Sequence, residues 1–148
     1  MRQLLTNSYW VKTQYERPDE QIGAHVKTLY DEIGYPLTIQ NVSTKPGVTS
    51  SIHNHGTWGV IFQIAGEDRH RFWQRVNLEG HVSVDSVHIE PTGEHILRPG
   101  DILSFHPNAI HQVETVGYEN SLTFQLYGDT QPKSRFQFQP QSHTAKCF

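Results

Sequence analysis

The sequence predicts an all-β fold, either a sandwich or a barrel of short strands such as a jelly roll. From residue 37 onward, segments rich in β-branched and aromatic residues alternate with turns rich in glycine, proline and asparagine. The chain has 148 residues, of which 35% are hydrophobic and 11% aromatic, and this suits one domain with an aromatic core. We therefore expect a single domain, in which an N-terminal arm and helix (residues 1–36) pack on a barrel (residues 37–148).

The expected elements follow in chain order. Residues 1–15 are mixed in composition and predict a poorly anchored arm. Residues 18–32 predict the only helix, because acidic residues stand in the first turn and apolar residues recur at helical spacing from Ile22 to Tyr30. Strands are expected at 37–43, 48–55, 58–64, 70–77, 81–89, 95–97, 101–105, 110–116, 121–127 and 135–139. The tail, residues 140–148, is expected to lie against the surface.

Composition excludes several classes of function. A net charge of −3 and a pI near 6.3 argue against a nucleic-acid partner. The single cysteine, Cys147, excludes an internal disulfide framework and a cysteine-rich metal site. No stretch approaches the roughly 18 apolar residues of a membrane span, and the N-terminal residues lack the apolar core of a signal peptide. We expect a cytoplasmic protein, a monomer or a small homo-oligomer, that binds no membrane.

Histidines are the candidate metal ligands. In a strand, His53 and His55 would point to the same side, roughly 6–7 Å apart at Cα, and could converge on one ion. Two unrelated histidines on the solvent face of a hairpin are the simpler reading. His111, which starts a strand directly after a turn, is the candidate for a third ligand, since a jelly roll can bring it opposite the pair. His106 competes with it, as a ligand, a group behind the ligands or a histidine beside a turn.

The same residues give the chain a resemblance to the cupins. The first cupin motif is matched by Gly47, His53, His55 and Gly66, with Gly59 at the position of the usual glutamate. The second is matched by Gly100-Asp101 and His111, with His106 in the usual proline position and Pro107 one residue later. The resemblance implies a cupin jelly-roll β-barrel in which His53, His55 and His111 bind the metal, and the short N-terminal helix expected from the apolar spacing would pack on it. Three histidines without the usual glutamate are the point at which this chain departs from the cupin pattern.

A narrower resemblance points to the thiol dioxygenases of the cysteine dioxygenase group. Residues 53–60 read His-Asn-His-Gly-Thr-Trp-Gly-Val and are similar to the His-Asp-His-x-x-Trp-Gly-Val segment of bacterial members. Residues 121–128 resemble their Ser-x-His-x-Tyr-Gly strand, with Thr123 at the serine and Gln125 at the histidine. The resemblance implies Fe(II) bound by three histidines, Tyr127 as a catalytic group, and Thr123 and Gln125 behind it. Some relatives crosslink this tyrosine to a cysteine, which Gly59 cannot supply.

The chemistry of three neutral imidazoles agrees with this reading. They leave a metal ion its full charge and half of an octahedral sphere, so that a small thiol and O2 can react at one site to give a sulfinic acid. Zn, Ni or Mn could occupy the same ligands. A non-redox isomerase or lyase, or a cupin that only binds a small molecule, therefore stays open as an alternative.

Arg135 and Trp58 are the candidates for binding the substrate. Arg135 follows the tyrosine strand, as does the carboxylate-binding arginine of the 3-mercaptopropionate enzymes, and Trp58 could form a wall of the pocket. Arg71 and Arg75 are weaker candidates. Cysteine-using relatives have an arginine near the position of the acidic pair Asp31-Glu32, so an amine-type thiol would also fit.

Overall fold

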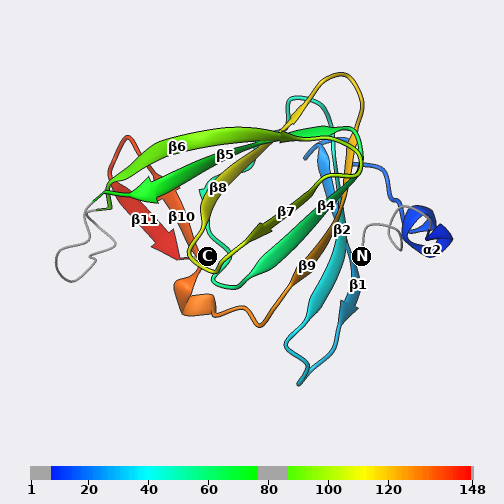
Figure 1. Cartoon of the computed structure of the whole chain (residues 1–148), viewed down its shortest axis with the longest axis horizontal. Coiled ribbons are helices and arrows are strands. Elements are labelled where there is room, and N and C mark those ends of the chain that lie inside the picture. The colour runs from blue at the N-terminus through cyan, green and yellow to red at the C-terminus, as the bar shows by residue number, and fades with distance from the viewer. Residues whose placement is uncertain (1–7, 77–86, 148) are drawn as a thin grey trace.

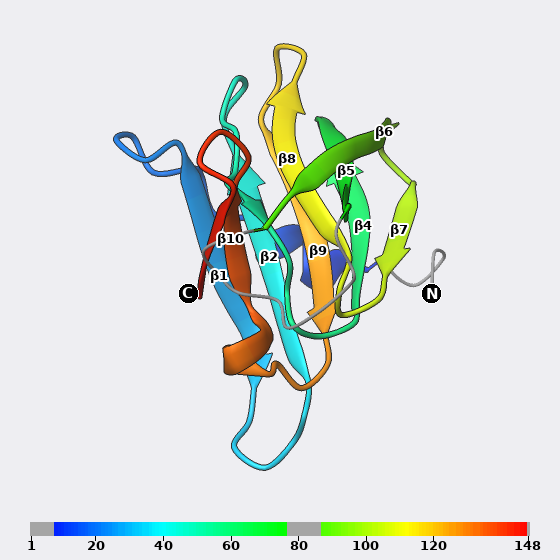
Figure 2. The ribbon, with the colours of Figure 1, turned by 90° about the vertical axis from the view of Figure 1, so that its left-hand side faces the viewer.

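The structure is a computed structural model that describes residues 8–76 and 87–147. Within these ranges the chain forms two antiparallel β-sheets (Figure 1). In Figure 2, strand β8 of one sheet crosses in front of β9 of the other. This two-sheet arrangement is typical of a cupin jelly roll and confirms the all-β prediction. Most of the expected strand 81–89, the end of the strand 70–77 and residues 1–7 of the arm fall outside the described residues.

The first sheet has five strands in the order β1-β2-β9-β4-β7. They are β1 (Ala24–Asp31), β2 (Thr38–Thr44), β9 (Ser121–Tyr127), β4 (Gly59–Ala65) and β7 (Ile102–Phe105).

The second sheet has six strands in the order β11-β10-β3-β8-β5-β6. They are β11 (Thr144–Cys147), β10 (Phe136–Gln139), β3 (Ile52–His53), β8 (Ile110–Val116), β5 (Glu67–Arg75) and β6 (Ile89–Leu97). A 3-10 helix, η1 (Pro132–Ser134), connects β9 to β10.

Side-chain alternation separates the two faces of the five-stranded sheet. Phe62 and Phe124 are register partners on β4 and β9, and they pack with Val11 of the short helix α2 (Tyr9–Thr13) on the outer face. Thr123 and Tyr127 point the opposite way, into a cavity between the sheets. The inner faces of the sheets are therefore available for a binding site.

The helix predicted at residues 18–32 is wrong. Asp19 does begin one turn, in which its carboxylate accepts hydrogen bonds from the backbone of Gln21 and Ile22, both at 2.8 Å. The turn ends at Gly23, which has a φ of 75°. The following residues form β1, whose backbone pairs with β2 from end to end. Pairing with a neighbouring strand thus overrides a helical spacing of apolar residues, and Val26 is 55% exposed rather than buried.

Other boundaries differ as well. The strand expected at 48–55 is reduced to β3, with an isolated bridge from Thr49 to Glu114 before it. The expected turn at residues 91–93 lies inside β6, which accommodates it as a bulge opposite Phe72 and Trp73. The tail contains β11, which pairs with β10. Among the described residues, no helix is long and apolar enough to cross a membrane.

Candidate metal centre

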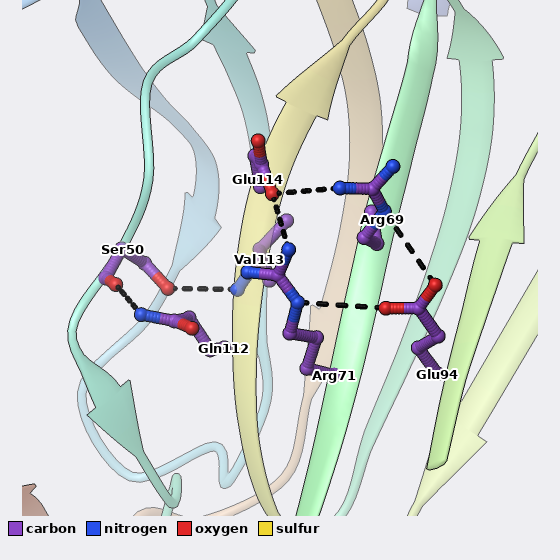
Figure 3. A network of polar contacts seen from close by, with 7 residues as sticks. All are labelled: Ser50, Arg69, Arg71, Glu94, Gln112, Val113 and Glu114. Atoms are coloured by element: carbon purple, nitrogen blue, oxygen red, sulfur yellow. Dashed lines mark hydrogen bonds and ion pairs between the residues drawn. The ribbon is translucent and has the colours of Figure 1, made fainter.

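Two of the candidate histidines lie side by side on neighbouring strands. His53 on β3 and His111 on β8 are register partners. The segment before β3 is held against β8 by Ser50, which accepts a hydrogen bond from the Val113 amide at 3.0 Å through Oγ and one from Gln112 Nε2 at 3.1 Å through its carbonyl (Figure 3). These bonds set the register that brings the two histidines together.

His55 completes the group from just beyond the end of β3. One ring nitrogen from each of His53, His55 and His111 can be chosen so that all three lie within 4.8 Å of one another. The Nε2 atoms of His55 and His111 are 2.9 Å apart. Two ligands at right angles, with metal–nitrogen bonds of 2.0–2.1 Å, would have nitrogens about 2.9 Å apart. The three side chains therefore fit a metal ion.

Neighbouring groups orient two of the rings. His53 Nδ1 lies 2.9 Å from the Ser51 carbonyl, so Nδ1 carries the proton and Nε2 has the lone pair. His111 Nδ1 lies 3.4 Å from Nδ1 of His70, which is 1% exposed on β5. Groups of this kind commonly fix the tautomer and orientation of metal-ligating histidines.

Burial keeps the three imidazoles neutral. Desolvation lowers the pKa of His53, lowers that of His55 to about 3 with help from His53 and Arg135, and lowers that of His111 well below its usual value. Neutral imidazole is the form that binds metal ions. The site can therefore accept a cation without displacing protons at neutral pH, but the ligand set alone does not identify the metal.

The histidines open onto a cavity of about 600 Å³ between the sheets. Hydrophobic and hydroxyl side chains form most of its wall, and β2 and β9 contribute alternate residues. A volume of this size suits a small organic molecule.

Thr123, Gln125 and Tyr127 form a hydrogen-bonded row on β9, in the wall of the cavity. The Tyr127 hydroxyl donates a hydrogen bond of 2.6 Å to Gln125 Oε1, and Gln125 Nε2 donates to Thr123 Oγ1 at 2.9 Å. Gln40 on β2 donates to the same Gln125 oxygen at 3.0 Å. The ring of Tyr127 stacks on His55, with 4.8 Å between centroids. The row is thus in direct contact with the histidine group.

Arg135 also lines this cavity, between η1 and β10. Its charge lies close enough to lower the pKa values of His53, His55 and Tyr127, although burial is the larger effect and leaves that of Tyr127 raised overall. Among the described residues that line the cavity, Arg135 is the one with a lysine or arginine side chain.

The two weaker arginine candidates lie elsewhere. Arg71 pairs with Glu114 at 3.0 Å and with Glu94 at 3.5 Å, in a network with Arg69 on the outer face of the six-stranded sheet (Figure 3). Arg75 lies over the rings of Phe136 and Phe138.

His106 and Trp58 are outside the cavity lining. His106 is exposed in the turn after β7, where its Nδ1 accepts a hydrogen bond from the Asn108 amide. Trp58 is 44% exposed and packs so closely on Gly128 that a Cβ there would lie 2.2 Å from its indole nitrogen.

Three neighbours of the histidines were not predicted: Asn54, His70 and Phe105. Phe105 occupies the space beside Gly59, where a Cβ would lie 2.4 Å from its ring, and its ring stacks on His55 at 4.9 Å. The alternation of β5 could have revealed His70, since it places His70 on the same face as the buried Asp68. No local pattern points to Phe105 or Asn54.

Comparisons with known proteins agree with this architecture. Residues 13–135 match the JmjC domain family. No curated protein matches the chain. The fold is similar to KdgF from Halomonas sp., with a TM-score of 0.57 and 16% identity over 85% of this chain and 98% of that one. It is also similar to a cupin superfamily protein from Desulfitobacterium hafniense DCB-2, with a TM-score of 0.54 and 15% identity over 78% and 84% of the chains.

A third similar structure is the DMSP lyase DddQ from Ruegeria pomeroyi DSS-3, with a TM-score of 0.52 and 20% identity over 71% of this chain. The match spans 46% of the lyase. At these identities the structures show a shared fold only. The family match covers most of the sequence, and so the chain belongs to the JmjC domain family and has the fold of the cupin superfamily.

Proposed function

We propose that the protein is an iron-dependent dioxygenase that adds O2 to the sulfur of a small thiol to give a sulfinic acid. One observation carries the proposal: three neutral histidines form a group that, among the described residues, includes no carboxylate, and they face a cavity that Tyr127 and Arg135 also line. His53, His55 and His111 would hold Fe(II). The bound iron would supply the redox chemistry that joins both oxygen atoms of O2 to a thiolate, and the balance is RS⁻ + O2 → RSO2⁻.

The side chains of the chain supply binding and orientation. Arg135 offers a planar fork of donors that suits a carboxylate. The Tyr127 hydroxyl donates its proton to Gln125. In this orientation its oxygen can accept a hydrogen bond from a ligand but cannot donate one. Burial raises the pKa of Tyr127, which keeps the phenol protonated at neutral pH. The preferred substrate is therefore a short thiol with a carboxylate, of the 3-mercaptopropionate type.

Oxygen uptake tests the proposal. Protein loaded with Fe(II) under nitrogen would be offered 3-mercaptopropionate, cysteine and 2-aminoethanethiol in turn, with uptake followed by electrode and product by mass spectrometry. We expect uptake in a one-to-one ratio with sulfinate, and none with His111→Ala. Fully iron-loaded protein that takes up no O2 with any of the three thiols would contradict the proposal and favour a lyase, an isomerase or a binding protein.

A further inference from the structure

We infer that Asn54 positions Arg135 to bind the carboxylate of the substrate. The inference rests on the proposed function, in which Arg135 binds that carboxylate, and adds the residue that holds the arginine in place. His53 and His55 line the cavity, whereas the Asn54 side chain between them is 3% exposed and reaches the segment 131–136 instead.

The amide of Asn54 holds the backbone on both sides of Arg135. Its Oδ1 accepts a hydrogen bond of 2.7 Å from the Phe136 amide, and its Nδ2 donates one of 2.8 Å to the Ser134 carbonyl. The backbone amide of Asn54 adds a bond of 3.2 Å to the Phe136 carbonyl. Nδ2 also lies 3.4 Å from the Pro107 carbonyl, which precedes β8. One buried side chain thus ties the arginine segment to the stretch of chain that carries His53 and His55.

Gly56 allows the same segment to come close. It has a φ of 62°, and a Cβ there would lie 2.8 Å from the Gln131 carbonyl oxygen and 3.2 Å from Arg135 Cγ. The Gln131 amide donates a hydrogen bond of 3.1 Å to the Gly56 carbonyl. The residues on either side of His55 therefore both fix the position of the arginine segment.

An amide is the chemical group that these partners need. The Phe136 N–H requires an acceptor and the Ser134 carbonyl requires a donor, and a carboxylate could satisfy only the first. A fork-to-fork contact between arginine and a carboxylate depends on geometry, so an arginine on an anchored backbone binds better than one on a mobile loop. We therefore expect the loss of Asn54 to weaken the binding of carboxylate-bearing ligands selectively.

The test measures ligand binding as well as turnover. Calorimetry under nitrogen, on protein loaded with Fe(II), would give the affinity for 3-mercaptopropionate and for 2-aminoethanethiol, which has no carboxylate. We expect Asn54→Ala to weaken the binding of 3-mercaptopropionate about tenfold, which is less than the loss expected for Arg135→Gln. The affinity for 2-aminoethanethiol should change little. In the double variant the two effects should not add, because both act on one contact. In kinetics the loss should appear in KM rather than kcat.

Asn41→Ala is the matched control. Asn41 is 2% exposed, and its Nδ2 donates to the carbonyls of Val11 and Gln14, away from the cavity. Asn41→Ala should lower the stability of the protein, and it should not change the affinity for one thiol relative to the other. If Asn54→Ala does not fold, Asn54→Ser replaces it, since serine keeps a polar group in the same space.

The outcomes separate the inference from the proposed function. Three results would each overturn the inference. The Asn54 variant could bind both thiols equally more weakly, its effect could add to that of Arg135→Gln, or the wild type could bind the two thiols with equal affinity. Selective weakening in a protein that oxidises neither thiol would support the role of Asn54 and reject the dioxygenase.

Discussion

The Tyr127 hydroxyl donates its proton to Gln125 Oε1, two residues earlier on the same strand, at 2.6 Å. The glutamine also receives a bond from Gln40 and gives one to Thr123. A group that accepts and donates in this way holds the phenol in a single orientation beside the His55 ring. The thiol dioxygenases that this chain resembles have a histidine at the position of Gln125. Here the glutamine amide, which does not titrate, makes these hydrogen bonds instead.

Replacing the phenol tests whether it takes part in turnover. Tyr127→Phe removes the hydroxyl and leaves the stacking on His55, so we expect turnover to fall about a hundredfold. Metal content, measured by atomic emission, should not change. Tyr118→Phe is the control, since Tyr118 is fully exposed. Unchanged turnover in Tyr127→Phe would mean that the hydroxyl has no part in the reaction.

The three-histidine group predicts a clear difference between two neighbouring histidines. His111→Ala removes a buried ligand, so we expect metal affinity to fall by at least about tenfold. His106→Ala should bind the metal ion with the affinity of the wild type, because His106 is exposed in the turn before β8. Competition with a chromogenic chelator measures both. A similar loss in the two variants would place the ion elsewhere.

His70 is expected to act through His111. Their Nδ1 atoms are 3.4 Å apart. Metal binding through His111 Nε2 requires the proton on His111 Nδ1, and that N–H then donates to His70 Nδ1. We expect His70→Ala to reduce metal affinity about tenfold, and His70→Asn to restore part of it by supplying a polar group. The Co(II) absorption spectrum should shift in the alanine variant. His95→Ala, on the exposed strand opposite His70, is the control.

Asp68 predicts a pH dependence of stability. Its carboxylate is 3% exposed and accepts hydrogen bonds from Ser121 at 2.6 Å and Thr115 at 2.9 Å. Burial raises its pKa despite these bonds, so the folded state favours the protonated form. The contribution of Asp68 to stability is therefore present below its unfolded pKa and is lost as the pH rises through the folded pKa.

Urea unfolding of the wild type and Asp68→Asn between about pH 4 and pH 7 measures this effect. We expect the free energy of unfolding of the wild type, relative to the variant, to fall as the pH rises. Asp129→Asn, at an exposed position, should show no such trend. A relative gain in wild-type stability toward neutral pH would be the opposite of the expected sign.

Gly59 predicts a packing defect that a second change can relieve. A Cβ there would lie 2.4 Å from the ring of Phe105, so Gly59→Ala should destabilise the protein by about 1–3 kcal/mol. Phe105→Leu in the same chain should recover part of the loss. Gly93→Ala is the control, since nothing lies within 4 Å of its Cβ position. Thermal unfolding compares the wild type, Gly59→Ala, Phe105→Leu, the double variant and the control. Additive effects of the two substitutions would contradict a clash between Gly59→Ala and Phe105.

The sequence predicted strands better than it predicted contacts. The expected strands at 110–116 and 121–127 coincide with β8 and β9, because turns bound both and their side chains alternate. The helix at 18–32 failed because pairing with β2, a long-range interaction, decided the structure of β1. In the site, strand spacing predicted that His53 and His55 share a side, and the resemblance to the cupin motifs added His111. The alternation of β5 indicates the side of the sheet on which His70 lies, but its contact with His111 depends on the packing of distant segments, and so do the contacts of Phe105 and Asn54.

The division of the cavity between the two sheets has an evolutionary consequence. His53 and His111 come from the six-stranded sheet, and the row from Thr123 to Tyr127 comes from the five-stranded one. Substitutions on β2 and β9 can therefore change the side chains that the cavity offers to a ligand while the strands that carry His53 and His111 stay intact. A scaffold divided in this way could exchange one reaction for another and still keep its three histidines.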